Sequence, residues 1–182
     1  IHALPQGCCL RVTRGAAPEL VTYYDAASDV SEAEHTRLRG SSVEQVLDEL
    51  DALLIRSVGE NLRGTGQCAV ALSGGVDSTV LCALARRQAS VQAVHVSVPQ
   101  GKGYDERRTA ERIAKLNGVP LSVVTMSGEL YRNTLVQATA ANEMPLWHLQ
   151  NLGYFLASQR AAELGIDTLL CCGTSVSGCV RA

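Results

Sequence analysis

Residues 71–78 read Ala-Leu-Ser-Gly-Gly-Val-Asp-Ser, and this stretch decides both the fold and the candidate site. An apolar run, residues 68–72, leads into it, and residues 78–87 continue from it with a helical pattern. Gly74 and Gly75 let the backbone turn tightly and approach a phosphate closely. The helix that follows offers unpaired N–H groups and a partial positive charge to an anion. The stretch therefore predicts a phosphate-binding turn between a strand and a helix.

Three hydroxyl groups and one carboxylate complete this turn. Ser73, Ser78 and Thr79 add hydroxyl donors. Asp77 would repel a bare phosphate, so it is better explained as a ligand of a Mg²⁺ ion that bridges the phosphates. The turn is not a Walker loop, because the spaced second glycine and the lysine are absent, and it lacks the Gly-x-Gly-x-x-Gly of a dinucleotide site. The alternative is a serine-glycine turn that only caps the helix.

Strand and helix patterns alternate from this turn onward. Strands are predicted at residues 68–72, 91–98, 121–125 and 168–172, and helices at residues 78–87, 105–116, 129–138 and 149–164. This order implies an α/β fold with a parallel sheet covered by helices on both faces. Ligands of such sheets bind at the carboxyl ends of the strands, which is where the turn lies.

The N-terminal part of the chain has a different pattern. Residues 1–37 carry short apolar runs broken by glycine and proline, and residues 20–24 are the best strand among them, so we expect a lead-in hairpin. Residues 28–42 are polar and irregular and predict a linker. Ser41 stands three residues before Glu44 as a capping box, and residues 43–62 then show the apolar spacing of an amphipathic helix.

Composition limits the partners and the location. The 182 residues are 46% hydrophobic and 19% charged, with a net charge of −2, which suits one core and argues against nucleic acid or an anionic membrane as partner. No apolar stretch approaches the roughly 20 residues that span a bilayer, so we expect a soluble, cytoplasmic protein. The seven cysteines form no Cys-x-x-Cys pair, which favours ordinary buried thiols over a zinc or redox site.

Residues 71–78 resemble the signature of the PP-loop ATP pyrophosphatases, a superfamily that cleaves ATP between the alpha and beta phosphates. Within it, the chain is most similar to the synthetase domain of asparagine synthetases and of the related β-lactam synthetases and lasso-peptide cyclases. Residues 2–7, running on to 23–25, resemble the Leu-Pro-Pro-Gly stretch that joins a glutaminase-like domain to the synthetase domain. Residues 104–106 are similar to an Asp-Glu helix after the second strand, and residues 142–145 to an Asp-Glu-Pro region.

The resemblance implies an ATP-dependent ligase that forms an amide. A carboxylate, on a small molecule or a peptide, attacks the alpha phosphorus, pyrophosphate leaves, and an amine captures the acyl-adenylate. ATP and Mg²⁺ are the implied cofactors. A glutaminase-like domain or partner and a homo-oligomer are the associations that the resemblance suggests.

The resemblance also gives roles to individual residues. Pyrophosphate and metal would be held by Ser73, Gly74, Gly75, Asp77 and Ser78, with Asp77 as the metal ligand. Adenine would lie against strand backbone near Ala71, Leu72, Val96 and Ser97. A second phosphate-facing turn would be formed by Gly173, Thr174 and Ser175.

Three further side chains are candidates for acid-base work. Glu143 is the candidate carboxylate that handles the incoming amine, as base or orienting group, and its alternative is a solvated loop glutamate. His95 and His148 could be ligands or acid-base groups. In the apolar strand 91–98, however, a histidine such as His95 is more often a satisfied core residue.

The C-terminal residues depart from the family pattern. The family continues Ser-Gly-x-Gly-x-Asp-Glu after its last strand, whereas residues 171–178 read Cys-Cys-Gly-Thr-Ser-Val-Ser-Gly, and no lysine follows Lys115. Truncation, a loop lost near Ser175, or lost activity would each explain the difference. We expect a fragment: residues 1–37 are the hairpin and linker left from the junction to a missing N-terminal domain, and residues 38–182 are an ATP-binding synthetase domain truncated at its C-terminus.

Two other functional classes stay open. Another PP-loop enzyme, acting in sulfur transfer or tRNA modification, would use the same loop and predicts a reactive cysteine or a basic surface. A non-catalytic nucleotide-binding module would explain the absent acidic pair and lysine.

Overall fold

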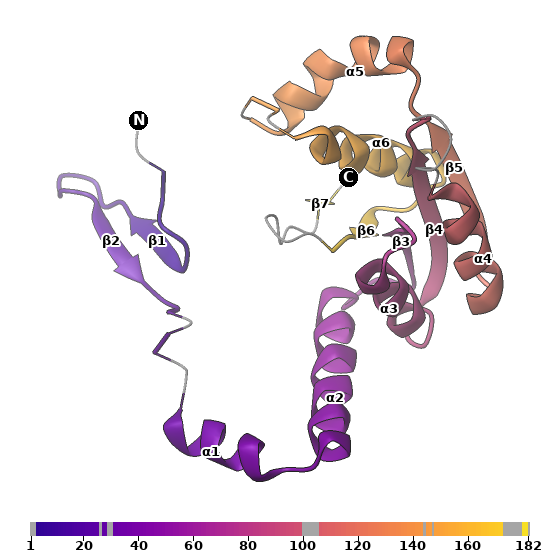
Figure 1. Cartoon of the computed structure of the whole chain (residues 1–182). Coiled ribbons are helices and arrows are strands. Elements are labelled where there is room, and N and C mark those ends of the chain that lie inside the picture. Colours follow the sequence, from indigo (N-terminus) through magenta and orange to yellow (C-terminus); the bar gives the residue numbers. More distant parts are fainter. Residues whose placement is uncertain are drawn as a thin grey trace. The chain divides into compact units, whose positions relative to one another are not determined.

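The computed structural model describes residues 3–25, 27–28, 31–99, 106–143, 145–146, 148–172 and 180–181. The chain divides into two compact units, Ile1–Asp51 and Ala52–Ala182, which are described separately below. Figure 1 labels their helices and strands along the chain.

A short antiparallel hairpin opens the first unit. Strands β1 (Cys8–Arg11) and β2 (Glu19–Thr22) pair with Cys8 opposite Thr22, which confirms the predicted lead-in hairpin. Gly7 has a φ of +69°, and a Cβ there would lie 2.0 Å from the carbonyl oxygen of Tyr24. The N–H groups of Tyr23 and Tyr24 both donate to the carbonyl of Gly7, so the strand ends need a glycine for this close approach.

The prediction of an irregular linker at residues 28–42 was wrong, because most of this segment forms helix α1 (Glu32–Gly40). Ser31 caps this helix by accepting a hydrogen bond from the N–H of Glu34, and its last turn carries basic residues that complement the helix dipole. None of the α1 residues is buried, so no apolar periodicity marked the helix in the sequence.

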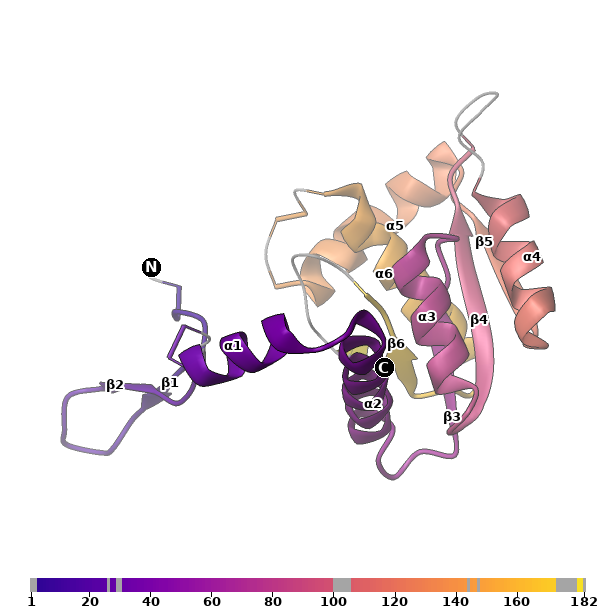
Figure 2. The ribbon, with the colours of Figure 1, turned by 60° about the horizontal axis from the view of Figure 1, so that its bottom comes forward.

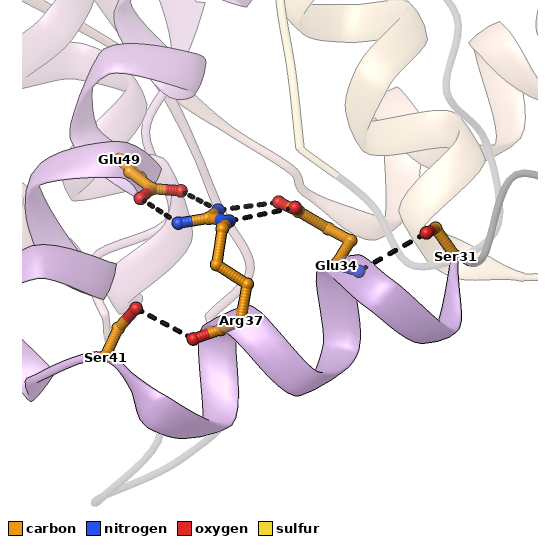
Figure 3. A network of polar contacts seen from close by, with 5 residues as sticks. All are labelled: Ser31, Glu34, Arg37, Ser41 and Glu49. Carbon is orange, nitrogen blue, oxygen red and sulfur yellow. Dashed lines mark hydrogen bonds and ion pairs between the residues drawn. The ribbon is translucent and has the colours of Figure 1, made fainter.

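Arg37 links α1 to the start of α2 (Val43–Asn61), as Figure 3 shows. Its guanidinium donates to Glu34 at 2.6 and 2.9 Å and to Glu49 at 2.7 Å through two nitrogens. The hydrogen bonds from Arg37 lower the pKa of both carboxyl groups, and together they raise the pKa of Arg37. All three side chains are about half exposed, so the network fixes an angle between two helices more than it adds stability.

The capping box of α2 lies one residue later than predicted. The hydroxyl of Ser42 accepts from the N–H of Gln45, and the Gln45 side chain accepts from the N–H of Ser42. Ser41 instead ends α1: its N–H donates to the carbonyl of Leu38 and its hydroxyl to that of Arg37. Because both serines have an acidic or amide residue three positions on, the spacing alone could not choose between them.

A five-stranded sheet forms the centre of the second unit, in the order β5-β4-β3-β6-β7. Its strands are β3 (Gln67–Ala71), β4 (Ser90–Ser97), β5 (Leu121–Thr125), β6 (Thr168–Leu170) and β7 (Val180–Arg181). The first four strands are parallel, which confirms the predicted α/β fold. Strand β7, which the sequence did not predict, pairs antiparallel with β6.

Helices cover both faces of this sheet (Figure 2). One face packs against the second half of α2, α3 (Val76–Ala85) and α4 (Arg107–Asn117). The core on this face contains Cys68 and Val70 of β3 and Leu72, which follows β3. The other face packs against α6 (Leu149–Glu163), and α5 (Gly128–Ala141) lies beside α6. Gly118 ends α4 with a φ of +62°, a left-handed angle that glycine adopts easily. Within the described residues, no helix is both long and apolar enough to cross a membrane.

Candidate active site

A cavity of about 450 Å³ opens at the carboxyl edge of β3 and β4. The loop after β3 contributes Leu72 and Ser73 to its wall, α3 contributes Ser78, and α6 contributes Tyr154. Among the described residues that line it, none is a lysine or arginine, and Glu106 is the acidic one. Backbone N–H groups and a bound metal ion would both attract a polyanion at this edge.

The loop between β3 and α3 is pressed against the first turn of α4. Gly74 has a φ of +96°, and a Cβ on it would lie 3.2 Å from Cβ of Thr109 and 3.4 Å from the carbonyl oxygen of Glu106. Both the backbone angle and the available space therefore require glycine here. The sequence argument that a glycine lets the loop turn tightly is supported at this position.

Two serine hydroxyls hold the loop from inside. The N–H of Gly75 donates to Ser73 Oγ at 3.2 Å, the two serine Oγ atoms lie 3.0 Å apart, and Ser78 Oγ donates to the carbonyl of Gly75 at 3.1 Å. Because Ser78 gives its only hydroxyl proton to Gly75, the proton between the serines comes from Ser73. Ser78 is also only 3% exposed. Both hydroxyls thus shape the loop here, and their predicted role as phosphate donors stays a prediction.

The start of α3 is open to an anion. Gly75 is its N-cap residue and provides no side-chain cap, so no described side chain occupies the N–H groups of the first turn. Val76 is 78% exposed and Asp77 is exposed as well, so this turn is accessible. Unpaired N–H groups and the positive end of the helix dipole favour a phosphate at this point.

Two described carboxylates, Asp77 and Glu106, belong to the segments that meet at this helix start. Glu106 begins the turn of α4 that contacts Gly74, and it lines the cavity. Asp77 lies close enough to Cys172, a lining residue, to raise the pKa of that thiol, although burial is the larger cause. The described residues contain no cluster of three metal-ligating side chains. Mg²⁺ typically takes one or two carboxylates and leaves its other positions to phosphates and water.

Comparison with known proteins supports the relationship that the loop suggested. The sequence profile of the asparagine synthase family matches residues 49–172, more than half of the chain. The chain belongs to the asparagine synthase family. The comparison with curated protein sequences gave no match.

Two solved structures are similar to this family member. NMN synthetase from Francisella tularensis shares 14% sequence identity with a TM-score of 0.49, and the match covers 67% of this chain and 52% of that one. The NH3-dependent NAD synthetase from Campylobacter jejuni shares 15% with a TM-score of 0.45, over 67% and 54% of the two chains. The chain thus spans about half the length of both structures.

Of the residues predicted to lie near adenine, some line the cavity and one does not. Leu72 and Val96 line the cavity together with Ala71. Ser97 is not among the described lining residues: it is buried, and its carbonyl accepts a hydrogen bond from the N–H of Met126 at 2.8 Å. The structure therefore places three of the four predicted residues in the lining of the cavity.

His95 and His148 both line the cavity, in different surroundings. His95 is buried, and its Nδ1 lies 2.7 Å from the carbonyl oxygen of Leu72. His148 is exposed and caps α6, where its Nδ1 accepts from the N–H of Gln150 at 3.2 Å. This acceptor role leaves the proton of a neutral His148 ring on Nε2.

Tyr154 is a cavity residue that sequence reasoning missed. Its hydroxyl donates to the carbonyl of Cys172 at 2.9 Å and accepts from the Gln150 side chain at 2.8 Å. Burial raises the pKa of Tyr154, and the nearby thiols of Cys171 and Cys172 add to the effect. No motif marks this tyrosine, because it lies in the middle of a helix pattern and only the folded chain brings it to the end of β6.

Glu143 lies two residues beyond α5 and is exposed. Its φ of +53° is left-handed, and its N–H donates to the carbonyl of Ala140, so it ends the helix where glycine is usual. It is not among the described residues that line the cavity. Gly173, Thr174 and Ser175 lie outside the described residues, and so do residues 104–105 and 144 of the segments that carried the resemblance.

Proposed function

We propose that this chain carries the ATP site of a ligase that joins a carboxylate to an amine. In the proposed reaction, the carboxylate oxygen bonds to the alpha phosphorus of ATP while the bond from that phosphorus to the bridging oxygen breaks. Pyrophosphate leaves with the electron pair, and the acyl-adenylate forms. The amine then attacks the acyl carbon, AMP leaves, and the amine loses a proton.

The observation that carries this proposal is the uncapped start of α3 at the edge of the cavity. The loop holds its own shape through Ser73 and Ser78, which leaves the N–H groups of the first turn for phosphate oxygens. Positioning of ATP against the carboxylate, with donors already in place, is most of what such a reaction needs from the protein. The membership of residues 49–172 in the asparagine synthase family supports the same reaction class.

Asp77 is the proposed metal ligand, and Glu106 is a second carboxylate, which lines the cavity. When bound, Mg²⁺ would offset the negative charge that develops on the leaving pyrophosphate. Adenine would lie against the strand backbone near Leu72 and Val96, which both line the cavity. Glu143 remains our proposed group for the incoming amine, although its described position is outside the cavity lining.

Sulfur transfer is the second candidate function, and Cys172 is the residue to weigh for it. Cys172 lines the cavity, as a transfer cysteine would. Burial and the Asp77 carboxylate raise the pKa of its thiol, however, and a transfer cysteine needs the opposite, a stabilised thiolate. These causes favour the ligase over sulfur transfer.

Pyrophosphate release tests the proposal. Purified protein is incubated with MgATP and a panel of carboxylates and amines, and pyrophosphate and AMP are measured together. We expect both products in equal amounts and an amide by mass spectrometry. Hydrolysis to ADP, or no nucleotide turnover with any carboxylate, would contradict the ligase. Cys172→Ser separates the two candidates, since amide formation survives that change and sulfur transfer does not.

A further inference from the structure

The two ring nitrogens of His95 have opposite surroundings. The side chain is 3% exposed, and Nδ1 lies 2.7 Å from the carbonyl oxygen of Leu72. Because a carbonyl can only accept, Nδ1 carries a proton and donates it. Nε2 is buried and has no partner within the described part of the chain. The pattern that predicted a satisfied core histidine is thus only half right.

An unpaired buried nitrogen destabilises a fold, so packing alone does not explain an imidazole at this position. The alternation along β4 places His95 on the same face as Val91 and Ala93, which belong to the core under α3 and α4. A phenylalanine would fill a similar space there without a polar atom. What the imidazole adds is the donor at Nδ1.

That donor acts on the peptide group at which the strand becomes the loop. The N–H of Leu72 still bonds to the carbonyl of Val94 in the manner of the sheet, at 2.9 Å. The next peptide group has side-chain partners on both sides: its carbonyl, on Leu72, accepts from His95, and its N–H, on Ser73, donates to Ser78 Oγ at 3.3 Å. A peptide group is planar, so two such bonds fix its rotation.

We infer that His95 is a positioning residue of the PP-loop, which fixes the plane of the Leu72–Ser73 peptide before a nucleotide binds. A carbonyl turned toward the phosphates would repel them, and the bond to Nδ1 prevents that turn. Donors that are already oriented cost no reorganisation when the ligand arrives. The inference rests on the proposed function, because it takes the loop to hold the phosphates of ATP.

Two substitutions separate positioning from packing. His95→Asn keeps an N–H donor near the place of Nδ1 but leaves unfilled space, whereas His95→Phe fills the space and removes the donor. His35→Asn, an exposed histidine in the first unit, serves as the control. For each full-length variant, the Kd for MgATP is measured by calorimetry, Tm by melting, and the exchange rate of the Ser73 amide by NMR without nucleotide.

We expect the affinity for MgATP to depend on whether residue 95 has an N–H donor, and not on the Tm of the variant. His95→Phe should melt at or above the temperature of His95→Asn, yet bind MgATP about tenfold more weakly, the effect of one lost hydrogen bond. Its Ser73 amide should exchange about tenfold faster, while His95→Asn and the control stay within about threefold of the original protein. The inference fails if His95→Phe matches the original protein in both readouts, or if His95→Asn loses as much affinity and protection as His95→Phe.

The free-protein readout keeps this inference distinct from the proposed function. If the original chain binds no MgATP, the proposed function fails, and Ser73 exchange alone decides the role of His95. Faster exchange in His95→Phe than in His95→Asn would then still support the tether on Leu72, and equal exchange would overturn it.

Discussion

Asp77 stands exposed in the first turn of α3, at the positive end of the helix dipole and beside a cavity without a described cationic side chain. A carboxylate at this point stabilises the helix modestly and would repel a phosphate. A cation between the carboxylate and a bound phosphate would reconcile the two effects. This reasoning, at the scale of one residue, leads to the first prediction.

Asp77→Asn should keep the fold but release pyrophosphate much more slowly. Asparagine is nearly isosteric and suits the first turn of a helix, so Tm should stay close to that of the original protein. Metal-dependent pyrophosphate release should fall at least about 100-fold, because the metal can no longer offset the charge on the leaving group. Asp167→Asn, exposed and before β6, is the control with unchanged release. Unchanged turnover in Asp77→Asn with normal melting would remove the metal role and favour a non-catalytic binding module.

How far the sequence specified the site differs from residue to residue. Gly74 was interpretable because a tight turn demands a backbone angle that only glycine adopts easily, and that demand is local. Ser78 was harder, since whether a hydroxyl faces a ligand or its own loop depends on where the carbonyl of Gly75 lies. Tyr154 was out of reach, because its partner Cys172 is 18 residues away in sequence.

At the scale of elements, the parallel strands were the easiest to predict. Strands β3 and β4 have buried residues on both faces and read as largely apolar runs, the pattern of a strand inside a parallel sheet. Helix α1 was missed for the opposite reason: all its described residues are partly or fully exposed, so capping and charge define it without apolar periodicity. Strand β7 spans two residues and gives too little pattern to recognise.

Two helix ends with the same backbone angle give the second prediction. Gly118 ends α4 at a φ of +62°, and Glu143 follows α5 at a φ of +53° with a side chain. Replacement by glycine should relieve strain at Glu143, so Glu143→Gly should raise the free energy of unfolding by up to about 1 kcal/mol. Gly118→Ala should lower it by about 1 kcal/mol for the converse reason. Urea denaturation of both variants checks the pair.

The opposite order of stabilities would show that the backbone angle at Glu143 is not strained. Glu143→Gly carries a second consequence, because Glu143 is also the proposed group for the incoming amine. If Glu143 acts on the amine, the more stable variant should form less amide while still releasing pyrophosphate. Unchanged amide formation would leave Glu143 with the capping role alone.

At the scale of the whole molecule, the two units differ in how much they bury. Every described residue of Ile1–Asp51 is at least partly exposed, whereas the second unit holds the buried core residues from Val58 onward. Exchange of backbone amides follows local opening, which is easier where little apolar surface is buried. Amides of β1, β2 and α1 should therefore exchange at least about 100-fold faster than those of β3 and β4. Mass spectrometry of deuterated peptides measures this, and slow exchange in the hairpin would mean that it is covered in solution.

The stability of the core should also depend on pH through its thiols. Cys68 and Cys82 are fully buried in the same core cluster, and each has a raised pKa. Burial raises the pKa of Cys68 to about 11 from an ordinary 9.0, and the neighbouring thiol of Cys82 adds to the rise. Alkaline pH therefore favours the unfolded chain, in which Cys68 loses its proton more easily.

The sign of the effect follows from proton binding in the two states. Below pH 9 both states keep the proton and the contribution is constant, whereas between about pH 9 and 11 the unfolded state has lost it and the folded state has not. The free energy of unfolding should thus fall across that window, by about 2 to 3 kcal/mol at most for this group. Cys68→Ala should be less stable than the original protein at about pH 8.5, because the substitution leaves a small void. Between about pH 8.5 and 11, however, its free energy of unfolding should fall less than that of the original protein, because the variant lacks the thiol that ionises. Parallel urea curves for the two proteins test this, and equal losses would show that Cys68 ionises as readily in the folded core as in water.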